Sequence, residues 1–382
     1  MDANAVLQEV RAIADRFATD RHERQRRDRL VPEEFAELAA AGFLLTGVPS
    51  AEGGLFESVA GSTRTVGDIL TALARGDASV ALVASMHPAV LSFWHASPDV
   101  SPEHQDAWSE QRAHVSQMAA DGAWFGTITS EPGSGGDVAR TTAVAEPGDD
   151  GGWRISGKKH FGSGSGVTSF MLTSARPPDE DPDWFFLDVR DVPWDGSRGM
   201  TLLAPWDGHG MTATQSHGME FDGFPATRFA WPGNWKALAD AAGPFIATTF
   251  TAVILGVVEA AMETARGQLA RKTLRAYEQV EWANAEQEAW LMRQAYEGML
   301  RAVETQPRPM PVVLLGKTAA ARLAEDCLRR IARIMGGGSF ARHSPFGFWF
   351  EDVRALGYLR PPWGLAYDAL IDALGADGPT GR

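Results

Sequence analysis

The sequence predicts a multidomain α+β protein, with an N-terminal helical domain at residues 1–118, a central β-barrel or sandwich domain at 119–232 and a C-terminal four-helix bundle at 233–382. Near both ends, apolar residues recur at three- and four-residue steps, the spacing of one buried helix face. Between them, short alternating or apolar runs are separated by glycine-rich turns, as in β-sheets. A chain of 382 residues is also long enough for two or three domains.

Three helices are predicted in the N-terminal part. Pro32, near a first turn, and Gly42, past a last turn, frame one short helix. Another runs from Asp77 to Trp94, with Asp77 or Ser79 as its N-cap. The first helix is expected to have one buried face, formed by Val6, Leu7, Val10, Ile13, Ala14 and Phe17.

The C-terminal part predicts three long helices and a short one, enough for a bundle. These are Phe245–Leu269, Val280–Val303, Val312–Met335 and Ala366–Leu374. Gly256 is expected to let the first of them pack closely on a neighbour. The three prolines between residues 306 and 311 predict a loop, because three prolines cannot lie inside one helix.

The composition, with 44% hydrophobic and 22% charged residues, is that of a soluble globular protein. A net charge of -14 argues against nucleic acid as a partner, because phosphate binding needs clustered lysine and arginine. The single cysteine, Cys327, is expected to be a small buried residue. No stretch approaches the roughly 20 apolar residues of a membrane helix, and no residue cluster has metal-ligand spacing. We therefore expect a cytoplasmic protein without a membrane segment or a metal.

Two runs rich in glycine and hydroxyl side chains follow one another in the central part. The first is Thr127-Ile-Thr-Ser-Glu-Pro-Gly-Ser-Gly-Gly-Asp137, and the second is Trp153-Arg-Ile-Ser-Gly-Lys-Lys-His-Phe-Gly-Ser-Gly164. Glycines let backbone N–H groups approach a ligand, and hydroxyls both donate and accept hydrogen bonds. This chemistry suits the edge of a planar heterocycle and a pyrophosphate. Either run alone is equally typical of an ordinary turn between strands.

The pair of runs, in this order, resembles the flavin-binding strands of the acyl-CoA dehydrogenase superfamily. Its signatures are Thr-Glu-Pro-x-x-Gly-Ser-Asp and, further on, Asn-Gly-x-Lys-x-(aromatic)-Ile-Thr-x-Gly. Ser130 stands in place of the threonine and Gly136 in place of the serine. The order of helical domain, β domain and bundle extends the resemblance over nearly the whole chain.

The resemblance implies FAD as the cofactor, or FMN if the protein is of the monooxygenase type. It assigns His160 to the position of an aromatic residue against the flavin. The residues that it implies as cofactor contacts in this part of the chain are Thr127, Thr129, Ser130, Gly135, Gly136, His160, Phe161, Gly162 and Ser163.

A second group of implied cofactor contacts lies in the C-terminal part. Arg271 and Thr273 match the family element whose arginine reaches the pyrophosphate of a neighbouring subunit, a task that suits a guanidinium. Gly336 and Gly337 match the glycines against which a partner's flavin lies. A solvated helix face and an ordinary glycine C-cap are the alternatives. The resemblance implies a homodimer or homotetramer.

The residues expected to perform the reaction depart from the dehydrogenase pattern. Dehydrogenation of an acyl thioester needs a carboxylate base, which the family places in Tyr-Glu-Gly. Those positions hold Leu359-Arg360-Pro361, and the alternative base position holds Ile246. Glu351 and Asp352 are the nearby carboxylates and therefore candidate bases.

A related branch, the two-component flavin monooxygenases, lacks that glutamate and often carries Ser-Gly where this chain has Ser163-Gly164. The histidine that those enzymes often carry would fall at Leu359. His87, on a helix expected to line the substrate cavity, is a candidate for orienting a substrate or a peroxide, and a buried histidine with satisfied hydrogen bonds is the more common alternative.

Three functions therefore stay open. One is dehydrogenation of an acyl-CoA or another acyl thioester, with an electron-transfer flavoprotein as redox partner. Another is oxygenation or oxidation of a small aromatic or apolar substrate, with a flavin reductase as partner. The third is a non-catalytic flavoprotein, in which side chains such as Trp349 or Trp363 fill the cavity.

Overall fold

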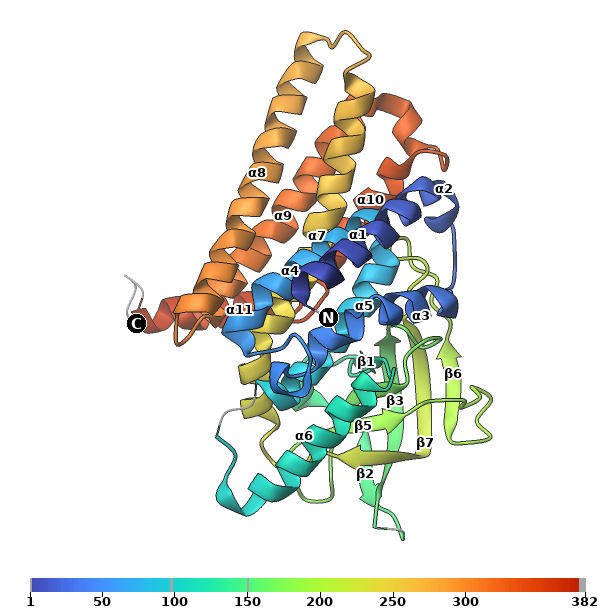
Figure 1. Ribbon diagram of the computed structural model, residues 1–382, viewed down its shortest axis with the longest axis vertical. Coiled ribbons are helices and arrows are strands. Elements are labelled where there is room, and N and C mark those ends of the chain that lie inside the picture. Colours follow the sequence, from blue (N-terminus) through green and yellow to red (C-terminus); the bar gives the residue numbers. More distant parts are fainter. Residues whose placement is uncertain (1, 97–98, 150, 378–382) are drawn as a thin grey trace.

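The structure, a computed structural model, describes residues 2–96, 99–149 and 151–377. Figure 1 shows a bundle of long helices above a twisted sheet, with the N-terminal helices packed beside both. The N-terminal elements are α1 (Ala3–Thr19), α2 (Arg21–Arg24), α3 (Pro32–Ala40), η1 (Phe43–Gly47), η2 (Ser50–Glu52), α4 (Val59–Gly76), α5 (Ala78–His95), η3 (Pro102–His104) and α6 (Gln105–Ala120). This confirms a helical N-terminal region.

The predicted signals for helix ends hold in detail. Pro32 is the first residue of α3, and Gly42 follows that helix with φ 83°. Asp77, not Ser79, caps α5, because its carboxylate accepts a hydrogen bond from the N–H of Val80 at 2.9 Å. Ser79 lies inside the helix.

The central region forms one seven-stranded sheet in the order β1-β4-β5-β7-β3-β2, with β6 paired to β7. The strands are β1 (Phe125–Thr127), β2 (Val144–Pro147), β3 (Trp153–Gly162), β4 (Phe170–Ala175), β5 (Asp183–Asp188), β6 (Met200–Ala204) and β7 (His217–Arg228). Strand β1 pairs with β4 in parallel and stands at the end of this order, and the chain after it still bonds to β4, since the N–H of Ile128 donates to the carbonyl oxygen of Leu172. Beyond it, Ile128 packs into the core under the sheet with Ile155 and Phe221.

The C-terminal helices are α7 (Trp235–Leu269), α8 (Ala276–Thr305), α9 (Met310–Met335), α10 (Pro345–Arg354) and α11 (Trp363–Asp377), with η5 (Gly336–Phe340) and η6 (Ala355–Gly357) between them. The expected start of α7 at Phe245 is wrong, because Pro244 lies inside that helix. Pro311 lies in the first turn of α9, where its missing N–H costs little. Helix α10 was not predicted.

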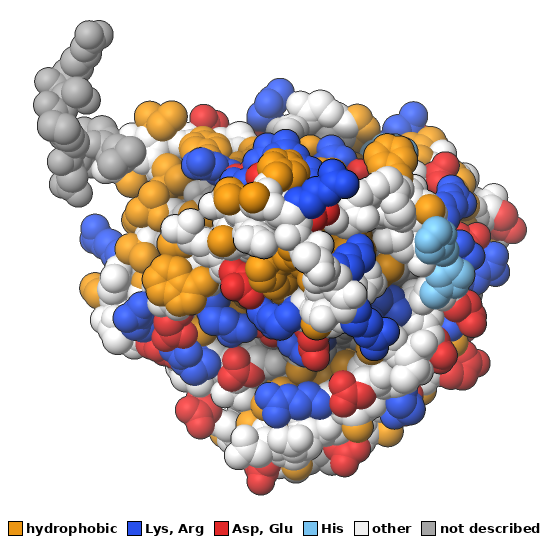
Figure 2. Space-filling model, turned by 90° about the horizontal axis from the view of Figure 1, so that it is seen from above, with side chains coloured by type: hydrophobic (Ala, Val, Ile, Leu, Met, Phe, Trp, Pro, Cys, Tyr) orange, Lys and Arg blue, Asp and Glu red, His pale blue; other side chains and the backbone are white. Residues whose placement is uncertain are grey.

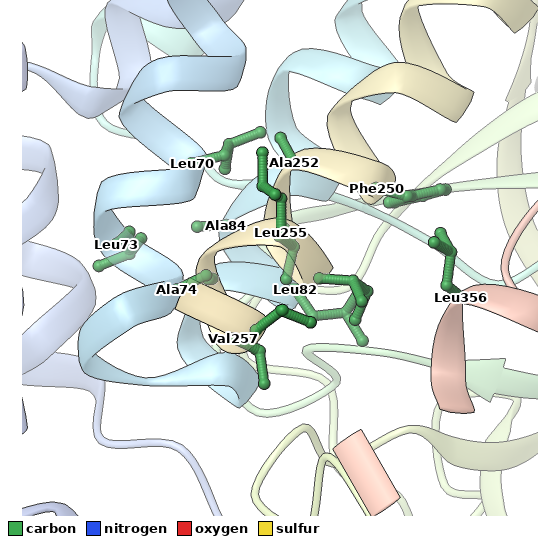
Figure 3. Close-up of a cluster of buried hydrophobic side chains, with 14 of the residues drawn as sticks. Leu70, Leu73, Ala74, Leu82, Ala84, Phe250, Ala252, Leu255, Val257 and Leu356 are labelled. Carbon is green, nitrogen blue, oxygen red and sulfur yellow. The ribbon is translucent and has the colours of Figure 1, made fainter. Parts of the chain in front are cut away.

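Helix α7 is the central element of the bundle. It has 35 residues and is apolar enough to cross a membrane by length and composition, so the expectation that no stretch is long enough is wrong. Its apolar window is 89% buried against neighbouring helices. Figure 3 shows Ala252, Leu255 and Val257 of α7 among side chains of α4 and α5. A Cβ on Gly256 would lie 2.3 Å from the carbonyl oxygen of Thr71, which confirms the expected close packing at that glycine.

Candidate functional site

The two signature runs lie side by side at the edge of the sheet. The N–H of His160 donates to the carbonyl oxygen of Ser130 at 2.8 Å. Isolated bridges pair Ser130 with His160 and Thr127 with Ser163. The structure therefore brings together two runs that are separate in the sequence, the first ending at Asp137 and the second beginning at Trp153.

A buried ion pair holds these runs together. The ammonium of Lys159, which is fully buried, lies 2.5 Å from Oε1 of Glu131. Thr142 donates to Oε2 of the same carboxylate from both its N–H and its hydroxyl, each at 2.6 Å. Burial alone would raise the pKa of Glu131, but Lys159 and the hydroxyls of Thr141 and Thr142 lower it to about 2. Both signature side chains therefore have a structural role.

The glycine turn between them offers its backbone to a ligand. Gly135 and Gly136 have φ 65° and 86°, values that favour glycine. A Cβ on Gly135 would meet no atom within 4 Å, so the space beside it is open. The hydroxyl of Ser134 accepts from the N–H of Gly136 and fixes the turn. An open, fixed glycine turn fits a flavin pyrophosphate or phosphate.

A chain of hydroxyls ties the second run to the loop before β7. Oγ of Ser163 lies 2.7 Å from Oγ of Ser216, which lies 2.7 Å from Oγ1 of Thr214. Thr214 in turn donates to the carbonyl oxygen of Met211. The hydroxyl of Ser163 thus bonds within the protein, and only a further hydrogen bond or its backbone is left for a cofactor.

Aromatic side chains stand at the outer end of β3. Phe161 has φ 60°, unusual for a residue with a side chain, and its side chain is 58% exposed. Its ring lies 6.2 Å from that of Trp206, centroid to centroid, in an edge-to-face arrangement. His160 is half-buried beside Gly218. A strained, exposed aromatic residue next to the glycine turn is typical of a ligand-binding position.

Arg360, which the family resemblance assigns to the base position, contacts the first signature run. Its guanidinium donates to Oγ1 of Thr129 at 2.6 Å and to the carbonyl oxygen of Gly136 at 2.8 Å. Desolvation lowers the pKa of Arg360 to about 10, so the group stays charged at neutral pH. Sequence analysis placed Arg360 at the base position but did not foresee that it contacts the cofactor runs.

Lys317 of α9 is a site residue that sequence analysis missed. It is only 2% exposed, and its ammonium donates to the carbonyl oxygens of Leu356 and Pro361 at 2.8 and 2.9 Å. Burial lowers the pKa of Lys317 to about 8. The signal in the sequence was a lysine on the same helix face as Val313 and Ala324, both fully buried.

The candidate catalytic groups have structural partners. His87 is fully buried; its Nε2 lies 2.9 Å from the carbonyl oxygen of Leu44 and its Nδ1 accepts from the N–H of Phe125 at 3.3 Å. Burial lowers the pKa of His87 to about 4, so the ring is neutral. With both nitrogens bound to backbone, His87 joins α5 to β1 and is not free to orient a substrate, contrary to its candidacy.

The two carboxylates of α10 are also occupied. Glu351 pairs with Arg354 at 2.5 Å. Asp352 accepts from the N–H of Met211 at 2.7 Å, and burial raises its pKa to about 7. Asp352 thus fixes the loop after β6 onto the bundle, and neither contact places its carboxylate on the signature runs.

The second group of expected cofactor contacts lies elsewhere. Arg271 and Thr273 are exposed in the turn between α7 and α8, and Gly336 and Gly337 follow α9. Figure 1 shows these turns at the upper end of the bundle, away from the sheet. Figure 2 looks onto that end, where hydrophobic side chains lie among lysines and arginines. Within one chain the two groups do not meet, so a shared cofactor would require a second copy.

Trp349 and Trp363 are accounted for by packing in the bundle. The Trp349 ring lies 5.5 Å from that of Phe346 and is 3% exposed. Trp363 stacks on Tyr367 at 5.7 Å and packs against Gly357.

A separate hollow of about 590 Å³ lies between α7 and α8 and is lined by several ion-paired residues, among them Arg75 and Glu259.

Comparisons with known proteins agree with this arrangement. The N-terminal domain of acyl-CoA dehydrogenases matches residues 1–99 and their middle domain matches residues 126–224, together more than half of the chain. The dibenzothiophene monooxygenase of Mycolicibacterium goodii is 26% identical over 272 residues, which span 68% of this chain and 61% of that enzyme. YdbM of Bacillus subtilis (strain 168), a candidate acyl-CoA dehydrogenase, is 26% identical over 410 residues, 97% of this chain and 96% of its own.

A solved structure shares the fold. KijD3 in complex with FMN and dTDP-3-amino-2,3,6-trideoxy-4-keto-3-methyl-D-glucose has a TM-score of 0.79 at 23% identity, over 98% of this chain and 94% of that one. Its similarity extends the match through the C-terminal bundle. Two domains of this family match the chain in the family's order, and the two signature runs of the middle domain are paired in the structure. The chain therefore belongs to the acyl-CoA dehydrogenase superfamily, a family of flavin-dependent enzymes.

Proposed function

We propose that this protein is a flavin-dependent monooxygenase that acts on a small molecule and receives reduced flavin from a separate flavin reductase. The observation that carries the proposal is that the guanidinium of Arg360, at the position that the family resemblance assigns to the dehydrogenase base, is bonded to Thr129 and Gly136. Dehydrogenation of a thioester requires a group that accepts the α proton. A guanidinium is protonated at neutral pH and cannot accept one.

The two carboxylates that are candidate bases also have other partners, which supports monooxygenation over dehydrogenation. Glu351 is ion-paired with Arg354, and Asp352 binds the backbone of Met211. Ile246, at the alternative base position, is apolar. Monooxygenation does not need a carboxylate base at these positions. The match to a dibenzothiophene monooxygenase adds support from a relative.

The residues present fit FMN or FAD, with the open glycine turn for phosphate and the Ser130–His160 pairing beside it. When bound and reduced, the flavin would supply two electrons to O₂, so that one oxygen atom enters the substrate and the other leaves as water. The chain's own part is to hold the flavin and exclude water. Arg271 and Gly336 of a second copy would complete the cofactor site, which makes the working protein at least a dimer.

The proposal is tested with purified protein loaded with FAD or FMN. Under anaerobic conditions a panel of acyl-CoAs of different chain length should leave the absorbance of the oxidised flavin unchanged. After chemical reduction, admission of oxygen should reoxidise the bound flavin more slowly than free flavin, because the site controls access of oxygen and water. Bleaching by any acyl-CoA would overturn the proposal in favour of dehydrogenation.

Equal reoxidation of bound and free flavin would also count against it and would favour the non-catalytic alternative. Loading with each flavin in turn, followed by gel filtration, shows which one the site retains. Coupling the protein to a flavin reductase and NADH then tests whether reduced flavin from a second protein sustains the reaction.

A further inference from the structure

No carboxylate in the described part of the chain forms an ion pair with Arg360, and the carboxylate that favours its charged form, Asp137, acts on it without a hydrogen bond. Among the residues that the structure describes, its side chain bonds only to the neutral oxygens of Thr129 and Gly136. The buried Arg24 differs. Arg24, which is 5% exposed, pairs with both Asp77 and Glu34.

A partly buried cation that no carboxylate contacts is unfavourable, since it has lost water and the more distant charge of Asp137 does not replace those hydrogen bonds. A guanidinium carries five N–H groups in a planar fork. The bonds to Thr129 and Gly136 each start from a different terminal nitrogen, so N–H groups remain for a ligand. The group that best suits such a fork is an oxyanion, bound through two parallel hydrogen bonds.

The position of Arg360 is fixed by its surroundings. Arg360 lies in the segment 356–361. The buried ammonium of Lys317 donates to the carbonyl oxygens of Leu356 and Pro361, at the two ends of that segment. On the far side, Pro362 packs so closely on Gly136 that a Cβ there would lie 3.1 Å from its Cγ. The guanidinium is therefore oriented before any ligand arrives, which lowers the entropic cost of binding.

We infer that Arg360 is the recognition residue for an oxyanion, a carboxylate, sulfonate or phosphate group of a ligand bound against the turn of residues 129–136. This inference rests on the proposed function and deepens it, because it names the chemical group that the site recognises. Where the substrate supplies that group, an aromatic or apolar substrate also carries a negative charge. Two ligands can bring such a group to this turn: the substrate, or the flavin through its phosphate.

The test compares wild type with Arg360→Met and Arg360→Lys, and uses Arg329→Met as the matched control. Arg329 pairs with Asp326 on the surface of α9, so its loss removes one positive charge away from the turn. Binding of FMN and of riboflavin is measured by fluorescence. Benzoate, methanesulfonate and inorganic phosphate are then titrated into the flavin-loaded protein, and the shift of the flavin spectrum is followed.

If the substrate supplies the oxyanion, at least one of these anions should shift the spectrum of wild type, and Arg360→Met should weaken its binding about tenfold or more while flavin binding is kept. If the flavin supplies it, wild type should bind FMN about tenfold more tightly than riboflavin, and Arg360→Met should abolish that preference. Arg360→Lys should fall between, since lysine keeps the charge but not the fork.

The inference is overturned if wild type binds no anion probe and FMN and riboflavin bind equally well. It is equally overturned if folded Arg360→Met matches wild type for every probe. The comparison of FMN with riboflavin needs only the wild-type protein. It therefore still tests the inference if Arg360→Met does not fold. Bleaching by acyl-CoA would remove the proposed function, whereas loss of anion binding alone would remove only this inference.

Discussion

The ammonium of Lys159 lies 2.5 Å from Oε1 of Glu131, and this buried ion pair connects the two runs that carry the flavin signatures. Lys159 also donates to the carbonyl oxygen of Ser174 in β4, at 2.5 Å. One side chain therefore ties together β3, β4 and the glycine turn. The glutamate and lysine of the family signatures are here explained by structure and not by contact with a ligand.

Lys159→Met should destabilise the protein by about 3 kcal/mol, because it leaves the Glu131 carboxylate buried without its cation. The free energy of unfolding in urea measures this loss. Lys158→Met is the matched control, since Lys158 is exposed and its nearest approach to Glu220 is 3.8 Å. That control should change stability by no more than about 0.5 kcal/mol. Equal losses for the two neighbours would show that the pair contributes nothing specific.

Asp352 should make stability fall as the pH rises. Burial, with Asp77 and Glu351 as like charges nearby, raises its pKa from 3.8 to about 7. Arg21 and Arg24 line the same small space. An acid with a raised pKa stabilises the folded state fully below the unfolded value, and that contribution is lost as the pH rises through the folded value.

Asp352→Asn should therefore flatten the dependence of Tm on pH between about 4 and 7, because the amide still accepts from Met211 but does not ionise. Thermal melts of both proteins across this range provide the measurement. The variant should be more stable than wild type above neutral pH. Parallel curves would mean that Asp352 titrates as an ordinary carboxylate.

Lys317→Met should loosen the segment that carries Arg360. Two buried carbonyl oxygens lose their donor, which costs about 2 kcal/mol. Flavin or anion binding should weaken as well, because Arg360 is no longer held in place. Lys236→Met, at an exposed position in α7, should change neither property. Unaltered ligand binding in the α9 variant would show that the segment is fixed by other contacts.

Arg271→Ala should weaken flavin binding about tenfold without changing the oligomeric state, if the guanidinium reaches the cofactor of a neighbouring copy. Lys272→Ala, the adjacent exposed residue, is the control. Analytical ultracentrifugation gives the oligomeric state. We expect at least a dimer, because the bundle exposes Tyr277, Val280 and Phe340 by 58%, 59% and 97% in the single chain. A monomer that binds flavin normally would contradict the shared site.

Much of the architecture could be predicted because its signals are local. Helical spacing predicted the bundle, and the resemblance to the two family signatures implied Ser130 and His160 as contacts of one cofactor, although it did not predict their pairing. Helix α10 was missed because Pro345 and Gly347 resemble a loop, although proline is well tolerated in a first turn. The start of α7 was misplaced because Pro244 resembles a boundary, whereas packing overrides it.

The site itself could be predicted only in part. Arg360 and Thr129 are 231 residues apart, and no local pattern reports a contact over that distance. The role of Lys317 depends on which carbonyl oxygens the bundle turns toward it. For His87 the sequence left two roles open, and the structure supports the buried, hydrogen-bonded one, because Leu44 and Phe125 occupy both its nitrogens.

The distance along the chain between Thr129 and Arg360 has a consequence for synthesis. The signature runs leave the ribosome first, and in the described ranges of the chain their sheet includes no strand after residue 228. The guanidinium emerges only after α7, α8, α9 and α10 have been made. A nascent chain can therefore form the glycine turn before Arg360 has been synthesised. Ligand binding through Arg360 becomes possible only after the long helices of the bundle have been translated.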